Sequence, residues 1–263
     1  MRLKNLETLK NDHKERIEMP IQTGLNVILI SHTPDPEKVI GSAARLCYSA
    51  VDLERLVSRT AAEDQTRFLQ QLTAVGHLSP TEHASFTFAV EGISRACSHQ
   101  LVRHRLASYS QQSQRYVSEA QFGFITPPSI QEDADLKDLF EQTMETIQSS
   151  YRRLAERLAE KGYSNEAARE DSRFVLPNAV ETKIMITMNA RELLHFFSQR
   201  LCNRAQWEIR ALALAMLRLV QAIAPNIFAD AGPPCLSGGC PEGVRSCGRP
   251  KEVRALLRVD RDQ

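Results

Sequence analysis

One stretch of the chain combines several positive side chains with no negative ones. Between Glu91 and Glu119 the sequence contains no aspartate or glutamate. An acid-free stretch of this kind meets either carboxylates from elsewhere in the fold or an anionic ligand, because solvated helix faces usually mix charges. Guanidinium groups bind phosphate through two hydrogen bonds, and the serines and glutamines that follow are neutral donors for a sugar or base. A nucleotide fits this set. The basic residues are Arg95, His99, Arg103, His104, Arg105 and Arg115.

Helical geometry separates the three consecutive residues Arg103, His104 and Arg105, here called the basic triplet. On a regular helix Gln100 shares a face with Arg103 and His104, whereas Arg105 points roughly 200° away from Arg103. Either the helix ends there, or its opposite sides contact two ligands or two subunits. Neither GxGxxG nor GxxxxGK[ST] occurs in the chain, so side chains must hold any nucleotide. Nucleic acid fits less well, because the stretch offers only two tyrosines for stacking.

The segment RHRLASYSQQS, from Arg103 to Ser113, resembles the RHRx7S signature of flavin-dependent thymidylate synthases. Three further segments agree with this family in order and spacing: GHLSPTEHASFTF, QLVRHR, and NRAQWEIR from Asn203 to Arg210. The resemblance covers residues 25 to 230. It implies reductive methylation of dUMP to dTMP, with methylenetetrahydrofolate as carbon donor and NADPH as reductant, through bound FAD. It also implies a homotetramer whose active sites are shared between subunits.

The resemblance further implies roles for individual residues. Those assigned to FAD are His77, Ser79, Arg103, His104, Arg105, Gln111, Arg200, Asn203 and Arg204. Those assigned to dUMP are Gln100, Arg103, Gln111, Gln112, Ser113, Gln114, Arg115, Lys183 and Arg210, with Arg115 as the phosphate ligand. Many relatives have glutamate in place of Gln111, and a phosphate-facing arginine is expected in place of Lys183. Both replacements keep a hydrogen-bond donor near the nucleotide.

Arg210 is the residue to which the resemblance gives a catalytic role, beside the uracil ring. A fixed cation next to the N3–H group stabilises the deprotonated ring, and the added electron density makes C5 a better nucleophile toward a one-carbon electrophile. No enzyme nucleophile is then needed. Ser113 is accordingly expected to contact dUMP and not to act as a covalent catalyst, since the sequence shows no partner base for it.

The six cysteines form two groups. Cys47, Cys97 and Cys202 lie among apolar neighbours and are expected to be small core residues. The other group, CLSGGCPEGVRSC, holds Cys235, Cys240 and Cys247 in a glycine-rich segment that the resemblance does not reach. Three explanations stay open for it: a surface tail with incidental thiols, a structural metal or iron–sulfur site that lacks one ligand, or a redox role.

No metal site is predicted elsewhere. His77 and His83 flank a helix start without a third ligand at a suitable spacing. Trp207 is expected in the core, because it precedes a strongly apolar helical pattern.

Composition limits the class of protein. The chain has 263 residues, with 33 Lys and Arg against 32 Asp and Glu, and a net charge of +1 excludes a histone-like polycation. A hydrophobic content of 42% is enough for a core and excludes disorder as the dominant state. In the most hydrophobic segment the longest apolar run extends only from Ala211 to Leu217, whereas a membrane span needs about 20 residues. With no secretory signal pattern at the N-terminus, we expect a soluble, cytoplasmic protein.

The elements that must position these residues follow from periodicity and caps. Alternation predicts strands at 26–31, around 86–90 and at 182–188, and helical spacing predicts helices at 36–49, 52–75, 94–106, 136–161, 166–174, 191–201 and 205–224. Ser79 is expected to cap a short helical turn that contains Pro80 and Glu82, and residues 108–116 are expected to form a polar loop. The pattern at 205–224 is apolar nearly all round and predicts a buried central helix.

These elements predict a single mixed α+β domain, with a small, mostly antiparallel sheet and a helical bundle. We expect an N-terminal arm at 1–24, the catalytic domain at 25–230, and a Cys- and Gly-rich tail at 231–263. Two rival functions remain. In the first, the basic stretch holds a nucleotide for regulation without turnover; in the second, it binds RNA together with the Cys-rich tail.

Overall fold

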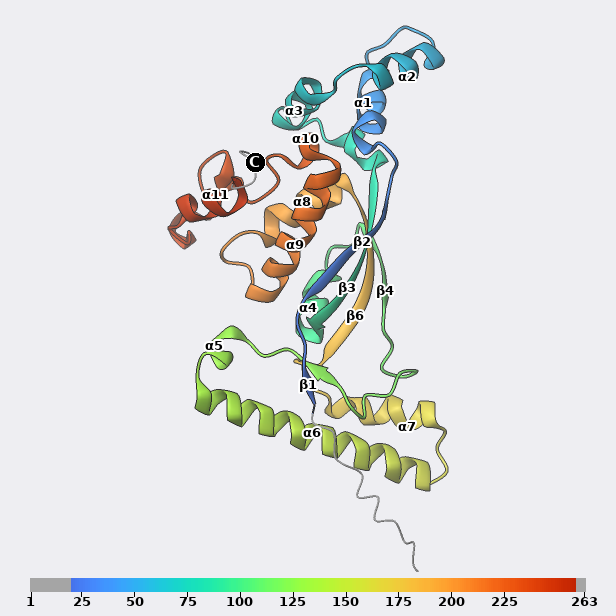
Figure 1. Cartoon of the computed structure of the whole chain (residues 1–263), viewed down its shortest axis with the longest axis vertical. Helices are drawn as coiled ribbons and strands as arrows, with labels where there is room; N and C mark the ends of the chain where they lie inside the picture. Colours follow the sequence, from blue (N-terminus) through green and yellow to red (C-terminus); the bar gives the residue numbers. More distant parts are fainter. Residues whose placement is uncertain (1–19, 259–263) are drawn as a thin grey trace, which may run out of the picture.

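A four-stranded antiparallel sheet forms the long axis of the molecule (Figure 1). The computed structural model describes residues 20–258; the predicted arm lies mostly outside these. The strands run in the order β2-β3-β6-β4, and every neighbouring pair is antiparallel. A parallel two-stranded ribbon, β1 with β5, lies at one end of the sheet. The strands are β1 (Ile21–Gln22), β2 (Asn26–His32), β3 (Ser85–Ser94), β4 (Ala107–Gln111), β5 (Gly123–Phe124) and β6 (Glu181–Asn189).

Alternating side chains give the sheet one buried and one open face. In β3, Phe86 and Phe88 are fully buried, as predicted from their spacing. The opposite face carries apolar side chains that remain exposed, with Ile28 and Ile30 of β2 at 54% and 52% and Met185 of β6 at 44%. An antiparallel sheet tolerates one solvated face, but that face is normally polar. The open face is therefore a candidate contact surface.

Helices cover the buried face and both ends of the sheet (Figure 1). Those that pack beside the sheet are α4 (Arg95–Leu101), α8 (Ala190–Arg200), α9 (Trp207–Ile223) and α10 (Pro225–Phe228). One end holds α1 (Pro36–Leu46), α2 (Leu53–Ala62) and α3 (Thr66–Ala74), and the other holds α5 (Pro128–Gln131), α6 (Ala134–Glu160) and α7 (Asn165–Ser172). The 3-10 turns of the described range are η1 (Ser79–His83), η2 (Arg173–Val175), η3 (Pro234–Leu236) and η4 (Gly243–Arg245), and the last described helix is α11 (Pro250–Arg258).

The predicted buried central helix is only partly right. In α9, Ile209, Leu212 and Met216 are fully buried, but Arg218 on the same helix is exposed. The helix therefore packs one face on the sheet and leaves the other accessible. Trp207 is 39% exposed, and its placement in the core was wrong. It is the first residue of α9, where the helix begins beyond the edge of the core.

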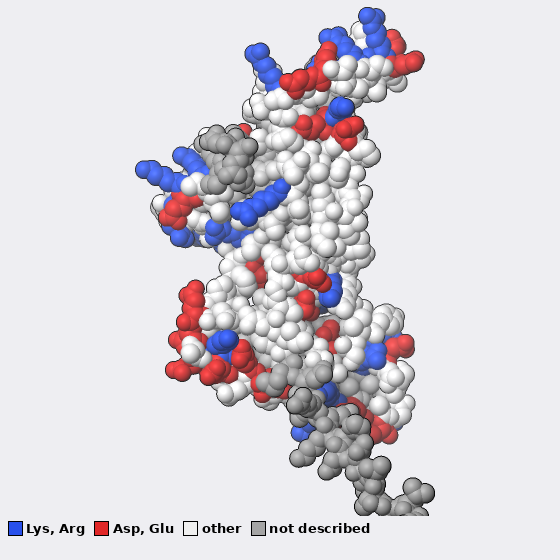
Figure 2. Space-filling view, in the orientation of Figure 1, with Lys and Arg blue, Asp and Glu red and all other residues white. Residues whose placement is uncertain are grey.

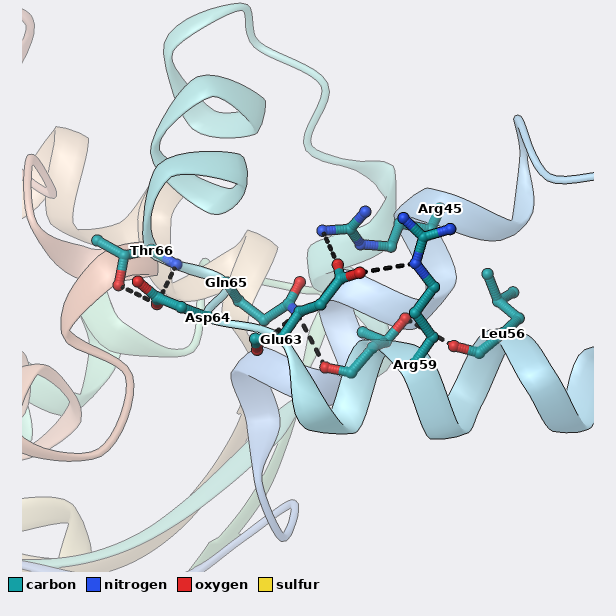
Figure 3. Close-up of polar contacts among 8 residues, drawn as sticks. Arg45, Leu56, Arg59, Glu63, Asp64, Gln65 and Thr66 are labelled. Atoms are coloured by element: carbon teal, nitrogen blue, oxygen red, sulfur yellow. Dashed lines mark hydrogen bonds and ion pairs between the residues drawn. The ribbon is translucent and has the colours of Figure 1, made fainter.

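The single helix predicted over residues 52–75 is wrong, because two helices occupy this range. Glu63 ends α2 with an extended backbone (φ −87°, ψ 148°). Its carboxylate lies 2.6 Å from Nε of Arg59 and 3.1 Å from Nη2 of Arg45 (Figure 3). The buried Gln65 side-chain amide donates to two backbone carbonyl oxygens at 2.9 and 3.0 Å. These local bonds satisfy the helix ends and outweigh the continuous apolar spacing.

Two further local predictions fail next to the basic stretch. The predicted short turn is present as η1, but Ser79 is its first residue and its side chain caps nothing, and Glu82 pairs with Arg191 of α8. The predicted loop at 108–116 contains β4, whose backbone pairs with β6 from Ala107 to Gln111. Tertiary pairing overrides the polar sequence here.

The fold class is otherwise as predicted: one α+β domain with a small antiparallel sheet. The predicted domain boundaries at 24/25 and 230/231 stay predictions. Among the described residues, no helix has the length and apolar character needed to cross a membrane.

Candidate functional site

The largest cavity near the basic stretch, here called the triplet cavity, has a volume of about 1150 Å³. It lies between the turn after α4, the start of η1 and the helix α8. Arg103, His104 and Arg105 line it, together with Arg200 of α8. Neither Arg103 nor Arg105 forms an ion pair with any residue in the described range. The cavity therefore offers unpaired guanidinium groups, which suit an anionic ligand.

The end of α4 explains how one triplet can point in two directions. The helix stops at Leu101, so the triplet is not helical. Arg103 and Arg105 are exposed, while His104 between them is only 6% exposed. The Tyr109 hydroxyl lies 2.9 Å from the carbonyl oxygen of Leu101 and 2.8 Å from that of His104. Of the alternatives left by the sequence, the first is correct: the helix ends before the triplet.

His104 is held as a neutral, oriented ring. The Arg200 Nε–H group donates to His104 Nε2 at 3.0 Å, so this nitrogen must be the acceptor. The opposite nitrogen, Nδ1, then carries the proton and donates to Glu192 Oε1 at 3.3 Å. Burial, followed by the positive charges of Arg200 and His195, lowers the pKa of His104 to about 4. The contact with Glu192 is thus a hydrogen bond from a neutral histidine.

A second hollow, here called the sheet cavity, lies on the open face of the sheet and measures about 490 Å³. Gln111, Gln112 and Lys183 line it, as do residues of β2 and β3. Lys183 Nζ lies 3.2 Å from Glu91 Oε2. Hydrogen bonding from Asn26, and then Lys183, lowers the pKa of Glu91. This cavity brings together three of the residues expected to hold dUMP.

The Gln111 side chain is already used within the fold. Its amide nitrogen donates to Ser98 Oγ and to Thr182 Oγ1, both at 3.0 Å. Ser98 belongs to α4 and Thr182 to β6, so Gln111 ties the start of the loop to two elements. Its remaining acceptor oxygen is what a ligand would meet.

The loop after β4 places the other predicted nucleotide residues away from the sheet cavity. Arg115 Nε lies 2.9 Å from Glu170 Oε2 of α7, so this arginine finds a carboxylate from elsewhere in the fold. Ser113 Oγ accepts from the Arg115 backbone N–H at 3.2 Å. The side-chain nitrogen of Gln114 is buried without a hydrogen-bond partner in the described structure. A buried unpaired donor indicates that an acceptor is missing there.

Arg210 and Gln100 lie on two helices that a buried carboxylate connects. Glu208, only 5% exposed, accepts from the Ser94 backbone N–H at 2.5 Å and from Ser94 Oγ at 2.6 Å. Ser94 Oγ in turn accepts from the Cys97 N–H at 3.0 Å and caps α4. The start of α9, which carries Arg210, is therefore fixed to the start of α4, whose other end carries Gln100.

The remaining residues predicted to bind the cofactor do not all lie at the triplet cavity. Ser79 is exposed and directly follows Leu78, which lines the triplet cavity. His77 contacts Tyr48 edge to face at 6.3 Å between ring centroids. Arg204 lines a different hollow and is paired with Glu242 of the C-terminal tail. The half-buried Asn203 lies beside it in the turn between α8 and α9.

Comparison with known proteins identifies the family. The family model described as thymidylate synthase complementing protein matches residues 28–226. A flavin-dependent thymidylate synthase of Geobacter sulfurreducens is 53% identical over 236 residues, covering 89% of this chain and 98% of the relative. The corresponding proteins of Clostridium tetani and Pyrococcus furiosus are 50% and 42% identical, covering 89% and 83% of this chain and 97% and 90% of the relatives. The chain belongs to the flavin-dependent thymidylate synthase family.

The residues that support the basic triplet are not evident from the sequence alone. Glu192 and Arg191 lie on α8, far along the chain from the residues that they contact. A local signal for Glu192 exists, because Asn189 caps α8 by accepting from the Glu192 N–H at 2.9 Å. That signal places a helix start but does not reveal the histidine. Glu208 lies inside the motif NRAQWEIR, yet nothing in its spacing points to Ser94.

Proposed function

We propose that this chain catalyses the reductive methylation of dUMP to dTMP, with methylenetetrahydrofolate as carbon donor, NADPH as reductant and FAD as bound cofactor. We place this reaction in the cytoplasm. The observation that carries the proposal is the position of β4. Its first end adjoins the triplet cavity, with its unpaired guanidinium groups, and its other end enters the sheet cavity. One short strand thus connects two anion-binding regions.

The triplet cavity fits FAD in donor set and size. A diphosphate carries two negative charges, and the guanidinium groups of Arg103, Arg105 and Arg200 suit them. The apolar walls formed by Leu106 and Leu194 suit a flat ring system. When bound, FAD supplies the hydride chemistry that links NADPH to the new methyl group. Neutral His104 adds no charge to this site and keeps Arg200 in a fixed direction.

The sheet cavity and the loop after β4 suit the nucleotide. Lys183 offers a point charge to phosphate once it turns from Glu91, and Gln112 offers an amide. The unpaired nitrogen of Gln114 offers another donor. To bind the phosphate, Arg115 must leave its carboxylate partner Glu170. Ser113 contacts the nucleotide without attacking it.

Arg210 performs the catalytic step that we assign to a side chain of this protein. Its guanidinium group stabilises the uracil ring deprotonated at N3, which raises the electron density at C5. Bond formation from C5 to the one-carbon unit then needs no covalent enzyme adduct. Glu208, fixed by Ser94, holds the first turn of α9 and with it the starting position of Arg210.

We also propose a homotetramer whose active sites combine residues of different subunits. β4 runs between the residues of the two cavities, and its five residues span about 17 Å. The triplet cavity and the sheet cavity of one chain are thus too far apart for one uracil ring to meet both. The open face of the sheet is apolar at Ile28, Ile30 and Met185, and Figure 2 shows few charges along the middle of the molecule. A second chain on this face would cover it.

The first experiment is the visible absorption spectrum of the purified protein under nitrogen, with NADPH added in the presence and absence of dUMP. A flavin band that bleaches at a rate changed by dUMP is the expected result. A colourless protein that takes up no FAD would instead favour a nucleotide-binding module without turnover. Light scattering should give about four times the chain mass of 29.6 kDa, and a monomer would contradict shared sites.

Arg210→Ala tests the catalytic assignment. Losing a preorganised cation beside the reacting ring should lower dTMP formation by about 100-fold or more while the flavin spectrum stays unchanged. Arg218→Ala is the matched control, because Arg218 lies on the same helix and is exposed. Unchanged turnover in Arg210→Ala would refute the role given to Arg210.

A further inference from the structure

Three cysteines from two distant parts of the chain lie around one hollow, here called the tail cavity. It has a volume of about 340 Å³ and is lined by Cys202, in the turn between α8 and α9, and by Cys235 and Cys240 of the C-terminal tail. Cys235 is 8% exposed, and the other two are half-buried. These positions correct one expectation, because the half-buried Cys202 lies beside tail thiols and is not a small core residue among apolar neighbours. The buried Cys235 also argues against the explanation of a surface tail with incidental thiols.

Cys247 belongs to the same group. Burial raises the pKa of the Cys235 thiol, and the charges of Cys202, Cys240 and Cys247 raise it further. Cys202 and Cys240 line the same hollow as Cys235, and Cys247 follows seven positions after Cys240 in the same tail segment. All six cysteines of the chain are free, so no disulfide explains this convergence. By contrast, Cys47 is exposed at the end of α1, which corrects its expected place in the core.

The tail has a small core of its own. Its buried core consists of Cys235, Leu236 and Val253, with Cys240 and Leu257 packed against it. Arg254 adds bonds to the backbone carbonyl oxygens of Cys235 at 2.8 Å and of Gly238 at 3.2 Å. Such a small core does not normally fix a folded segment, and segments of this size commonly rely on a disulfide or a metal.

We propose that Cys202, Cys235, Cys240 and Cys247 bind one zinc ion, which fastens the C-terminal tail to the turn between α8 and α9. Four thiolates in a tetrahedron at about 2.3 Å are a common structural zinc site. Cys202 supplies the fourth ligand that the tail segment alone lacks. The proposal does not depend on the proposed enzymatic function.

The thiols must close around the metal for this to happen. In the described part of the chain, no three or more His, Cys, Asp or Glu side chains are arranged to hold a metal ion. A Cβ atom added at Gly239 or at Gly243 would meet nothing within 4 Å, so the backbone between the tail thiols has room to move. Zinc binds thiolates, so its binding releases the thiol protons. The four thiols come together around the metal as it binds.

The metal would also affect the wall of the triplet cavity. Ser198, Gln199 and Arg200 line both the triplet cavity and the tail cavity. Glu242, between Cys240 and Cys247, pairs with Arg204. Fixing the tail thus fixes one side of the proposed cofactor site.

The first test is elemental analysis of the full-length protein, purified without a chelator or a metal-binding tag and then incubated with zinc and desalted. We expect about one zinc ion per chain. Cys240→Ser and Cys247→Ser should each lose the stoichiometric zinc, and Cys47→Ser, the matched control, should retain it. No zinc in the wild-type protein would overturn the proposal, as would an iron content with a coloured cluster.

The second test does not depend on whether the variants fold. Thiols of the native wild-type protein are counted with a chromogenic thiol reagent, before and after a strong zinc chelator is added. Zinc should protect Cys202, Cys235, Cys240 and Cys247, so chelation should expose four further reactive thiols and lower the melting temperature. A thiol count that a reductant raises and a chelator leaves unchanged would indicate a disulfide and overturn the zinc assignment.

Discussion

The buried contact between Glu208 and Ser94 is expected to be the most sensitive polar link between α9 and α4. Glu208→Gln changes one carboxylate oxygen into an NH2 group and leaves the shape of the side chain unchanged. The carboxylate now accepts from two donors, the N–H and O–H groups of Ser94, at 2.5 and 2.6 Å. In the glutamine variant one of these donors faces another donor, at a position that is only 5% exposed.

The size of the effect follows from these contacts. A hydrogen bond to a charged group contributes about 1.5 to 3 kcal/mol, and a buried donor left without an acceptor costs about 1 to 3 kcal/mol. Because part of this loss is recovered by the remaining amide oxygen, we expect Glu208→Gln to lower the free energy of unfolding by about 2 to 4 kcal/mol. Ser94→Ala loses one donor and the cap of α4, and a cap alone contributes about 1 kcal/mol.

Urea denaturation of the two single variants and the double variant measures this link, provided that the m-value stays constant. The double variant should be more stable than the sum of the single effects predicts, because both changes remove the same bonds. Glu160→Gln is the control, since Glu160 lies at the exposed end of α6 and should change stability by less than about 0.5 kcal/mol. A Glu208→Gln effect as small as that of the control, or strictly additive effects, would refute the reasoning.

Three other outcomes are expected. The pKa of His104 is about 4 in the folded chain against an ordinary 6.5, so the stability that it contributes is complete above pH 6.5 and is lost as the pH falls toward 4. Denaturation at pH 7 and pH 5 should show this loss, at up to about 1.4 kcal/mol per pH unit, and His104→Gln should remove it. Gly92→Ala should prevent stable folding, as judged by circular dichroism, because its Cβ would lie 1.8 Å from the Gly24 carbonyl oxygen, whereas Gly76→Ala, with a similar φ and open space, should cost only about 1 to 2 kcal/mol. Lys183→Ala should raise the KM for dUMP about tenfold with little change in kcat, and a change confined to kcat would contradict a phosphate contact.

The sequence predicted the elements whose signal is local. Alternation in β3 and β6 placed both strands, and Gly162, at φ +88°, ends the chain's longest helix where expected. The motif also identified residues that line the triplet cavity. Each of these features depends on side chains within a few positions of one another, which a periodic pattern records.

The features that the sequence missed depend on partners far along the chain. The polar segment at Ser108 and Ser110 becomes a strand because the edge of β6 supplies a ladder for its backbone. His104 is oriented by Glu192, which is 88 positions away, and Ser94 by Glu208, which is 114 positions away. No local pattern encodes such a pair. Only the folded chain shows that these carboxylates serve the basic stretch.

The acid-free stretch itself shows why this matters for function. Two of its arginines do find carboxylates: Arg115 pairs with Glu170, and Arg95 lies near the buried Glu119, whose pKa burial raises to about 7. Their positive charges are therefore explained by the fold. Arg103 and Arg105 have no such partner among residues 20–258, and both are exposed at one cavity. The proposed anionic ligand is thus supported by these two residues and not by the basic composition of the stretch, so binding should be lost by changing them and retained when Arg95 alone is changed.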